Sequence, residues 1–144
     1  MVRILNKDTS KIIDELKLCD DFNTFYCENK NYMVSETLSQ MLNVLLEEKG
    51  LKKADVIKKS ELSEVYSYQI FSGIRVPERK KLLCIAIGME LNLDEVQMLL
   101  KCAGYPPLYV KIPFDSIIIY GVCKKYSVIE INELLFEYEL ETLG

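Results

Sequence analysis

The amino-acid sequence predicts an all-α fold, and three observations support this prediction. Apolar residues recur at three- and four-residue spacing along most of the 144 residues, which is the period of one buried helical face. Asn92 and Ser127 are each followed three residues later by a glutamate, the pattern of a helix capping box. The stretch with the strongest strand propensity, 117–122, has no second strand to pair with, and a lone strand leaves its backbone groups unsatisfied. We therefore expect about seven or eight helices, one of them over 117–122.

We interpret residues 1–34 as an N-terminal helical extension. Ser10 is placed to cap a first helix, and the polar residues at 20–21 and 28–31 mark breaks or loops. A second, short helix is expected between these breaks and ties the extension to the rest of the protein. The apolar residues of the two helices are Ile12, Ile13, Leu16, Leu18, Phe22, Phe25 and Tyr26.

Residues 35–104 show the clearest helical periodicity. A first helix starts near Ser35 and ends at Gly50, and its apolar stripe follows the i, i+3, i+4, i+7, i+8 pattern. A helix of about two turns follows, anchored by Val56 and Ile57. The stripe of the first helix consists of Leu38, Met41, Leu42, Leu45 and Leu46.

A tight turn and another helix come next. Leu62 closes the turn, and Ser63 is a good N-cap because its hydroxyl can accept a hydrogen bond from an amide of the first helical turn. Ile70 and Phe71 are expected to face the core. Gly73 ends this helix, since a left-handed residue costs least as glycine.

Two more helices complete the segment 35–104. One starts at Pro77 and runs to about Glu90, and the other starts at Asn92 and ends before Gly104. Their inward residues are Leu82, Leu83, Ala86, Ile87, Val96, Leu99, Leu100 and Ala103.

Residues 105–144 are predicted to form a C-terminal helical hairpin. The 117–122 helix comes first, and the capping box at Ser127 starts the second helix. Leu134 and Leu135 lie on the apolar face of that second helix.

We expect these three parts to pack as one compact unit. A chain of this length buries about two-thirds of its unfolded surface, which supports one domain. The hairpin and the helix near Ile13 carry apolar faces but little positive charge, so each is expected to cover the core or to form a dimer contact. The core residues, each on the inward stripe of its helix, are Leu42, Leu45, Ile70, Leu82, Ala86 and Leu99.

Composition argues against several classes of protein. The chain has no histidine, so it lacks the usual general base and the nucleophile–histidine pairs of hydrolases, and it has no phosphate-cradling glycine motif. Its 5 cysteines are scattered, which favours reduced structural thiols over disulfides or a zinc site. No apolar run reaches the roughly 20 residues of a membrane span, and charges interrupt the N-terminus too often for a signal peptide. The sequence thus predicts a cytosolic protein that is not an enzyme and that needs no metal or cofactor.

Charge is distributed unevenly along the chain. Residues 50–83 carry eight basic and four acidic side chains, although the net charge of the whole chain is −4. Both flanks are acidic, with six basic and nine acidic residues over 1–49 and four basic and nine acidic over 84–144. A basic middle between acidic flanks is typical of a DNA-facing module, and the alternative is an ordinary solvated face.

The segment 51–77, LKKADVIKKSELSEVYSYQIFSGIRVP, resembles the helix-turn-helix of the phage-repressor or Xre-type family. The likeness covers about residues 36–100, and the downstream LDEVQMLLKCAGYPPLY is similar to bacterial helix-turn-helix regulators with an appended C-terminal hairpin. The residues that carry the resemblance are Leu51, Leu62, Ser63, Ile70, Phe71, Gly73, Arg75 and Pro77, followed by the apolar run LLCIAIGMELNL.

The resemblance implies a lambda-repressor-like core of about five helices in a sequence-specific transcriptional regulator. Helix 63–72 would enter the major groove of double-stranded DNA, and two copies would act as a homodimer. Gln69 would pair with adenine, Val65 would touch a thymine methyl and Glu64 would accept from cytosine. Lys53, Arg75, Arg79, Lys80 and Lys81 would contact the phosphate backbone. The implied DNA-facing residues are Lys53, Ser63, Glu64, Val65, Tyr68, Gln69, Ser72, Arg75, Arg79 and Lys80.

Three residues depart from the family's pattern. Glu61 occupies the turn position where the family prefers glycine, and Ser67 lies where the family usually has a branched apolar core residue. Glu64, with Glu61, places negative charge near the helix end that approaches DNA. A protein–protein interaction module with a degenerate helix-turn-helix, which no longer binds DNA, would show the same departures.

Two surface features separate these alternatives. An exposed apolar patch on helix 63–72 would favour the interaction module. A continuous basic rim from Lys52 through Arg75 to Lys81 would favour DNA binding.

Overall fold

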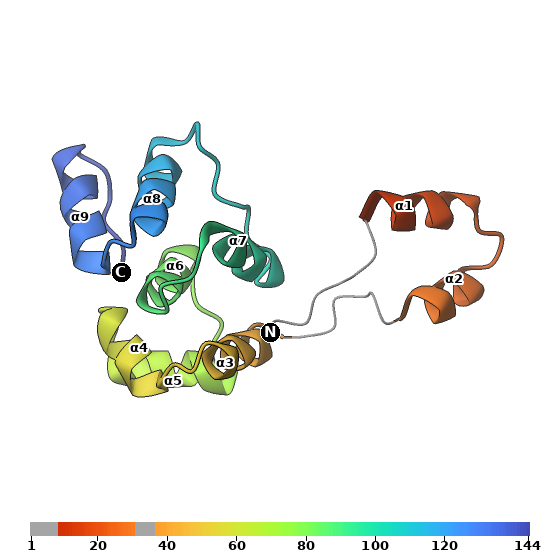
Figure 1. The fold of residues 1–144 in the computed structure, drawn as a ribbon, viewed down its shortest axis with the longest axis horizontal. Coiled ribbons are helices and arrows are strands. Elements are labelled where there is room, and N and C mark those ends of the chain that lie inside the picture. The colour runs from red at the N-terminus through yellow and green to blue at the C-terminus, as the bar shows by residue number, and fades with distance from the viewer. Residues whose placement is uncertain (1–8, 31–36) are drawn as a thin grey trace. The chain divides into compact units, whose positions relative to one another are not determined.

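The structure is a computed structural model that describes residues 9–30 and 37–144, and all regular secondary structure in these residues is α-helical (Figure 1). This confirms the predicted all-α fold. The described residues form nine helices, so the expectation of seven or eight was too low. Contacts divide the chain into two compact units, Met1–Ser35 and Glu36–Gly144. The predicted boundary between residues 34 and 35 lies outside the described residues.

The first unit contains α1 (Thr9–Leu18) and α2 (Phe22–Asn29). Asp21 separates two complete helices and caps the second, because its carboxylate accepts the hydroxyl and the backbone N–H of Thr24 at 2.7 and 3.2 Å. These hydrogen bonds also lower the pKa of Asp21. Ser10, which we expected to cap the first helix, lies inside α1 instead.

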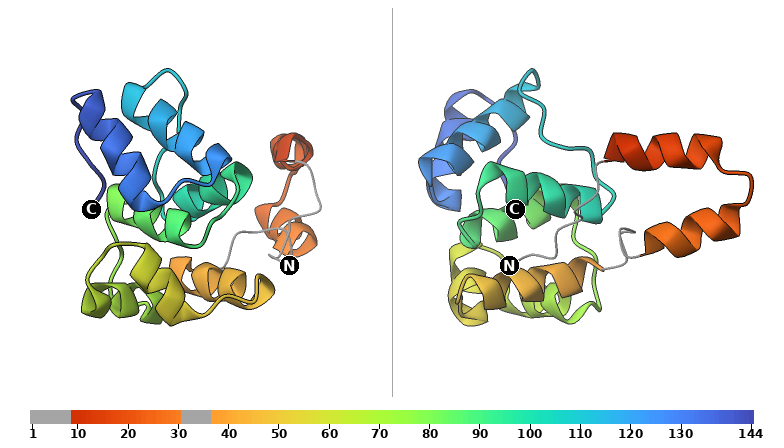
Figure 2. Two further views of the ribbon diagram at one scale, coloured as in Figure 1. Left: turned by 60° about the vertical axis from the view of Figure 1, so that its left-hand side comes forward. Right: turned by 45° about the vertical axis from the view of Figure 1, so that its right-hand side comes forward.

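The described part of the second unit contains seven helices arranged in three layers (Figures 1 and 2). Helices α3, α4 and α5 form one layer, α6 and α7 the middle layer, and the hairpin α8–α9 the third. The helix predicted over 117–122 is confirmed as part of α8. The bounds are α3 (Leu38–Glu48), α4 (Lys53–Lys59), α5 (Glu64–Ser72), α6 (Arg79–Gly88), α7 (Leu93–Cys102), α8 (Pro113–Lys124) and α9 (Val128–Glu137).

Capping explains where several of these helices begin. The capping boxes predicted at Asn92 and Ser127 are both present, at the starts of α7 and α9. A further capping box, which we did not predict, joins Thr37 and Gln40 at the start of α3. The expected helix start near Ser35 lies outside the described residues.

One buried core joins the three layers. Helix α6 forms its centre, because every residue from Leu82 to Met89 is buried and the helix is enclosed on all sides. The hairpin covers the core on the side opposite α3, α4 and α5, and it contacts both α6 and α7. Covering the core was one of the two roles that we expected of the hairpin. All six predicted core residues are at most 1% exposed, which confirms the helix registers: Leu42, Leu45, Ile70, Leu82, Ala86 and Leu99.

A close approach between α4 and α6 fixes the first helix of the predicted helix-turn-helix. A Cβ atom on Gly88 would lie 2.5 Å from the Ser60 Oγ and 2.9 Å from the Val56 carbonyl oxygen, so only glycine fits at this position. The buried Ser60 hydroxyl donates to the Val56 carbonyl at 2.7 Å. The turn after α4 therefore starts from a fixed point on the core.

The core assignment gives a first prediction. Leu45→Ala should lower the free energy of unfolding by about 2–5 kcal/mol, because Leu45 is fully buried and its truncation leaves a cavity. Val65→Ala, at a position 71% exposed, should change the same quantity by less than about 0.5 kcal/mol. Urea unfolding of both variants measures the difference, and equal stabilities would show that Leu45 is not a core residue.

Candidate nucleic-acid interface

The predicted turn is present between α4 and α5. Ser60 ends α4, and the Ser63 hydroxyl caps α5 by accepting the backbone N–H of Tyr66 at 3.2 Å. Glu61 has a φ of 59°, which places it in the left-handed region where the family pattern has glycine. Gly73 ends α5 with a φ of 87°. The order helix, tight turn, helix and left-handed glycine thus follows the sequence-based expectation.

Helix α5 has an inward and an outward face. Ile70 and Phe71 are buried, as is Ser67, whose hydroxyl donates to the Ser63 carbonyl at 2.9 Å. Ser67 can replace an apolar residue because this hydrogen bond satisfies its buried hydroxyl. Four of the predicted DNA-facing residues on α5 are exposed and Gln69 is partly exposed; the exposed ones are Glu64, Val65, Tyr68 and Ser72.

The end of α5 is held against α3 by Asn43. Its side-chain amide donates to the Ser39 carbonyl at 2.7 Å and to the Phe71 carbonyl at 2.9 Å, so a carbonyl in the last turn of α5 has a partner. The Lys53 ammonium lies over the Phe71 ring, 5.5 Å from its centroid. This contact places one of the predicted phosphate-binding cations beside α5.

Gln69 and Arg75 form a pair that the sequence did not predict. The Arg75 Nε donates to the Gln69 side-chain oxygen at 3.0 Å. That oxygen is one of the two groups that a glutamine uses for bidentate pairing with adenine. In this arrangement the Gln69 side-chain oxygen orients Arg75, and the N–H donors of the same amide take no part in the pair.

Tyr66 gathers two cations beside the loop that follows α5. The Arg75 guanidinium and the Lys81 ammonium lie 5.3 and 5.5 Å from the centroid of its ring. Burial raises the pKa of the Tyr66 hydroxyl. Tyr66 therefore holds two cations, Arg75 and Lys81, close to one ring.

Arg79 is occupied by contacts inside the protein. Its guanidinium donates to both oxygens of the Asp115 carboxylate, each at 3.1 Å, and to the carbonyls of Pro106 and Pro107 at 3.2 and 3.3 Å. Asp115 is only 2% exposed and also accepts the backbone N–H of Tyr109 at 3.0 Å. These bonds use four of the five guanidinium donors, so Arg79 links α6 to the hairpin, and its phosphate contact stays a prediction.

Lys80 also contacts the hairpin. Its ammonium forms an ion pair with Glu141 and lies 5.5 Å from the centroid of the Phe114 ring. The hydrogen bond and charge of Lys80 lower the pKa of Glu141. Two of the ten predicted DNA-facing residues, Arg79 and Lys80, are therefore engaged with the third layer.

The two features that separate the functional alternatives are both present in part. Along the expected rim, Lys52 and Arg75 are exposed and Lys81 is partly exposed. Apolar side chains are exposed beside them, on α5 and in the loop after it. These side chains are Val65 at 71%, Tyr68 at 42%, Ile74 at 78% and Val76 at 70% exposure.

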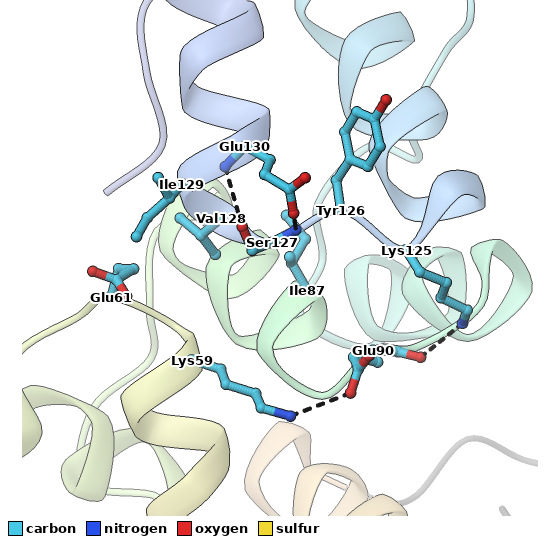
Figure 3. Close-up of a pocket in the computed structure, with 10 residues that line it drawn as sticks. All are labelled: Lys59, Glu61, Ile87, Glu90, Lys125, Tyr126, Ser127, Val128, Ile129 and Glu130. Carbon is cyan, nitrogen blue, oxygen red and sulfur yellow. Dashed lines mark hydrogen bonds and ion pairs between the residues drawn. The ribbon is translucent and has the colours of Figure 1, made fainter.

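A pocket lies where α4, α6 and α8 end (Figure 3). A non-glycine residue in the left-handed region follows each of these helices: Glu61, Glu90 and Lys125, with φ of 59°, 55° and 60°. Lys59 pairs with the Glu90 carboxylate at 3.3 Å, and Lys125 donates to the Glu90 carbonyl at 2.9 Å. Both lysines are thus directed at Glu90, and the contacts brace the three helix ends against one another.

No family model, curated protein or solved structure matches the chain. The family resemblance consequently rests on the quoted residues alone, and the repressor-like arrangement of the central helices stays a prediction. Among the described residues, no helix combines the length and apolar character needed to cross a membrane. Within the same part of the chain, no group of three or more histidine, cysteine or acidic residues is placed to hold a metal ion.

Sequence reasoning missed the residues that support this surface. Tyr66 and Asn43 act across elements that are distant in sequence, so no local pattern marks them. Asp115 had one available signal, because Ile118 and Ile119 lie three and four residues later on the same helical face, and an acidic residue on an apolar face needs a partner. The signal does not say which of the eight basic residues of the central segment that partner is.

Glu61 gives a second prediction. Glu61→Gly should raise the free energy of unfolding by about 1 kcal/mol, because glycine adopts the left-handed conformation without the Cβ penalty. Glu133→Gly, at an exposed position inside α9, should lower it by about 1 kcal/mol. Thermal or urea unfolding tests the opposite signs, and a loss of stability in both variants would contradict the assigned turn geometry.

The link between α6 and the hairpin gives a third prediction. Arg79→Ala should cost about 3–5 kcal/mol of unfolding free energy, because it leaves the buried Asp115 carboxylate without its cation. Arg75→Ala, which removes an exposed guanidinium four residues earlier together with its contacts to Gln69 and Tyr66, should cost only about 1 kcal/mol. If the two variants unfold at the same urea concentration, Arg79 has no structural role.

Proposed function

We propose that the protein is a sequence-specific DNA-binding transcriptional regulator that inserts α5 into the major groove of double-stranded DNA. The observation that carries the proposal is the two-faced character of α5. Ser67, Ile70 and Phe71 pack inward, while polar and apolar side chains suited to base edges face outward from a helix that follows a tight turn. Cations on both sides of this helix, Lys53 and Arg75, support it.

The proposed contacts divide into two classes. Lys53 and Arg75 hold the phosphate backbone and act on any sequence. Glu64, Val65 and Gln69 contact base edges and rank the sequences. Because Gln69 accepts a hydrogen bond from Arg75, the residue that reads a base and the residue that holds the backbone are coupled.

Two copies are proposed to act together as a homodimer in the cytoplasm. One helix of nine residues covers few base pairs, and a second half-site multiplies specificity.

The second candidate is a protein–protein interaction module, favoured by the exposed apolar side chains beside the cations. Ile74 and Val76 are more than two-thirds exposed, and DNA phosphates offer them no apolar partner. Glu61 and Glu64 also repel phosphates near the start of α5. A partner protein with an apolar strip would bury these side chains, whereas DNA binding uses the cations.

Duplex binding gives a fourth prediction. Lys53→Ala and Arg75→Ala should each weaken binding to all duplexes alike. Each should also reduce the slope of log affinity against log salt concentration by about one, because one phosphate contact is lost. Gln69→Ala should lower affinity for the preferred site by about 1–3 kcal/mol and leave non-specific binding nearly unchanged. Anisotropy titrations at two salt concentrations, with a duplex selected from a random pool, separate these effects.

Lys111→Ala provides the matched control, because it removes an exposed cation from the segment before α8. It should change neither the affinity nor the salt dependence. A wild-type protein that is folded but binds no duplex at low salt would exclude the DNA proposal and leave the interaction module.

A further inference from the structure

The hairpin α8–α9 has a second apolar face on the side away from the core. Its core-facing residues, such as Ile118 and Leu135, are fully buried. On the other side a groove runs between the two helices, and we call it the outer groove. Its lining residues are Pro113, Ser116, Ile117, Tyr120, Leu134, Tyr138 and Leu140.

The outer groove follows α8 from Pro113 to Tyr120 and is closed on its other side by Leu134, Tyr138 and Leu140. On α8 its residues recur at i, i+3, i+4 and i+7 from Pro113 to Tyr120, which makes one stripe along the helix. Tyr120 is 47% and Tyr138 64% exposed, so large aromatic rings stand in solvent on both helices. Covering the core requires only one apolar face of a hairpin, and a second, exposed one marks an interaction surface.

The two ends of the outer groove differ in net charge: Lys124 and Lys125 outnumber Glu130 at the turn end, and Glu137 and Glu139 outnumber Lys111 at the open end. Lys124 lies at the end where α8 turns into α9, and its ammonium is 5.7 Å from the centroid of the Tyr120 ring. Glu137 and Glu139 lie at the open end of the hairpin, and both are exposed. A two-fold axis across the groove places the turn end of one hairpin against the open end of the other. Each end would then meet the opposite charge.

We propose that the outer groove binds the outer groove of a second copy of this chain, so that two hairpins form an antiparallel four-helix bundle. Two helical hairpins are the natural halves of such a bundle, because the ridge of each fills the groove of the other. The inference deepens the proposed function, since it names the contact that makes the homodimer. The layer that contains α5 lies on the opposite side of α6 and α7, so this contact leaves α5 exposed in both copies (Figure 2).

Sedimentation equilibrium of the full chain without DNA, at about 5 to 200 µM, tests the proposal. The wild type should be dimeric in this range. Tyr138→Glu should raise the dissociation constant at least about 10-fold, because it removes an aromatic ring that lines the contact and puts a charge in its place. Phe136→Glu is the matched control: Phe136 is 79% exposed on the same helix but does not line the groove, so this variant should stay dimeric.

A charge-reversal experiment tests the predicted pairing of opposite charges between the two copies. A variant that failed to fold would not regain the dimer in the double variant. Lys124→Glu and Glu137→Lys should each weaken the dimer a few-fold, and the double variant should restore it. Because these residues lie at opposite ends of the hairpin, the restored pair must form between copies.

Three results would overturn the proposal: a wild type that is monomeric at 200 µM, a dimer that Tyr138→Glu leaves intact, or single charge variants that the double variant does not rescue. If the wild type is monomeric, the outer groove does not bind a second copy, and a different protein becomes the candidate partner. Since the experiment contains no DNA, its failure is separate from a failure to bind duplexes.

Discussion

The burial of helix α6 from Leu82 onward is the constraint on which the rest of the second unit depends. Its residues from Leu82 to Met89 have no exposed face, so other helices must cover it on every side. The layer with α4 and α5 covers one side, and the hairpin α8–α9 covers the other (Figure 1). The candidate interface and the outer groove therefore lie on opposite surfaces because the same apolar helix lies between them.

Polar contacts at the two ends of α6 fix the orientation of these layers. At its start, Arg79 binds the buried Asp115 and two carbonyls of the segment before α8. At its end, Gly88 lets Ser60 and α4 approach more closely than any larger residue allows. Apolar packing alone permits sliding between layers, whereas these directional contacts specify one arrangement.

Much of the fold follows from local sequence patterns. The helical spacing around Leu42, Leu45 and Leu99 gave the correct registers, and the capping boxes at Asn92 and Ser127 gave the correct starts. These features could be predicted because a cap or a stripe involves residues within one or two turns. The acidic Asp21 was correctly placed at a break, but its role as a cap for a complete helix was not anticipated, and the helix count was too low.

The candidate site was predicted less well, because side-chain partners come from distant parts of the chain. The outward set on α5 agrees with the expected register, since a helical period fixes which residues share a face. No local sequence pattern indicates which partner each basic side chain contacts. Arg75 and Lys81 turn toward Tyr66, while Arg79 turns toward Asp115, thirty-six positions later. Only the folded chain distinguishes a cation on the surface from one that holds two layers together.

The central claim is that α5 contacts duplex DNA, and a site-resolved titration tests it most directly. Amide chemical shifts of the full chain should be followed by NMR while a duplex selected from a random pool is added at low salt. The account predicts changes concentrated in α5, at the start of α4 and in the loop around Arg75, with the amides of α9 unaffected. Chemical shift changes confined to the hairpin would contradict the claim that α5 contacts duplex DNA. The absence of any chemical shift change with excess duplex would contradict it as well.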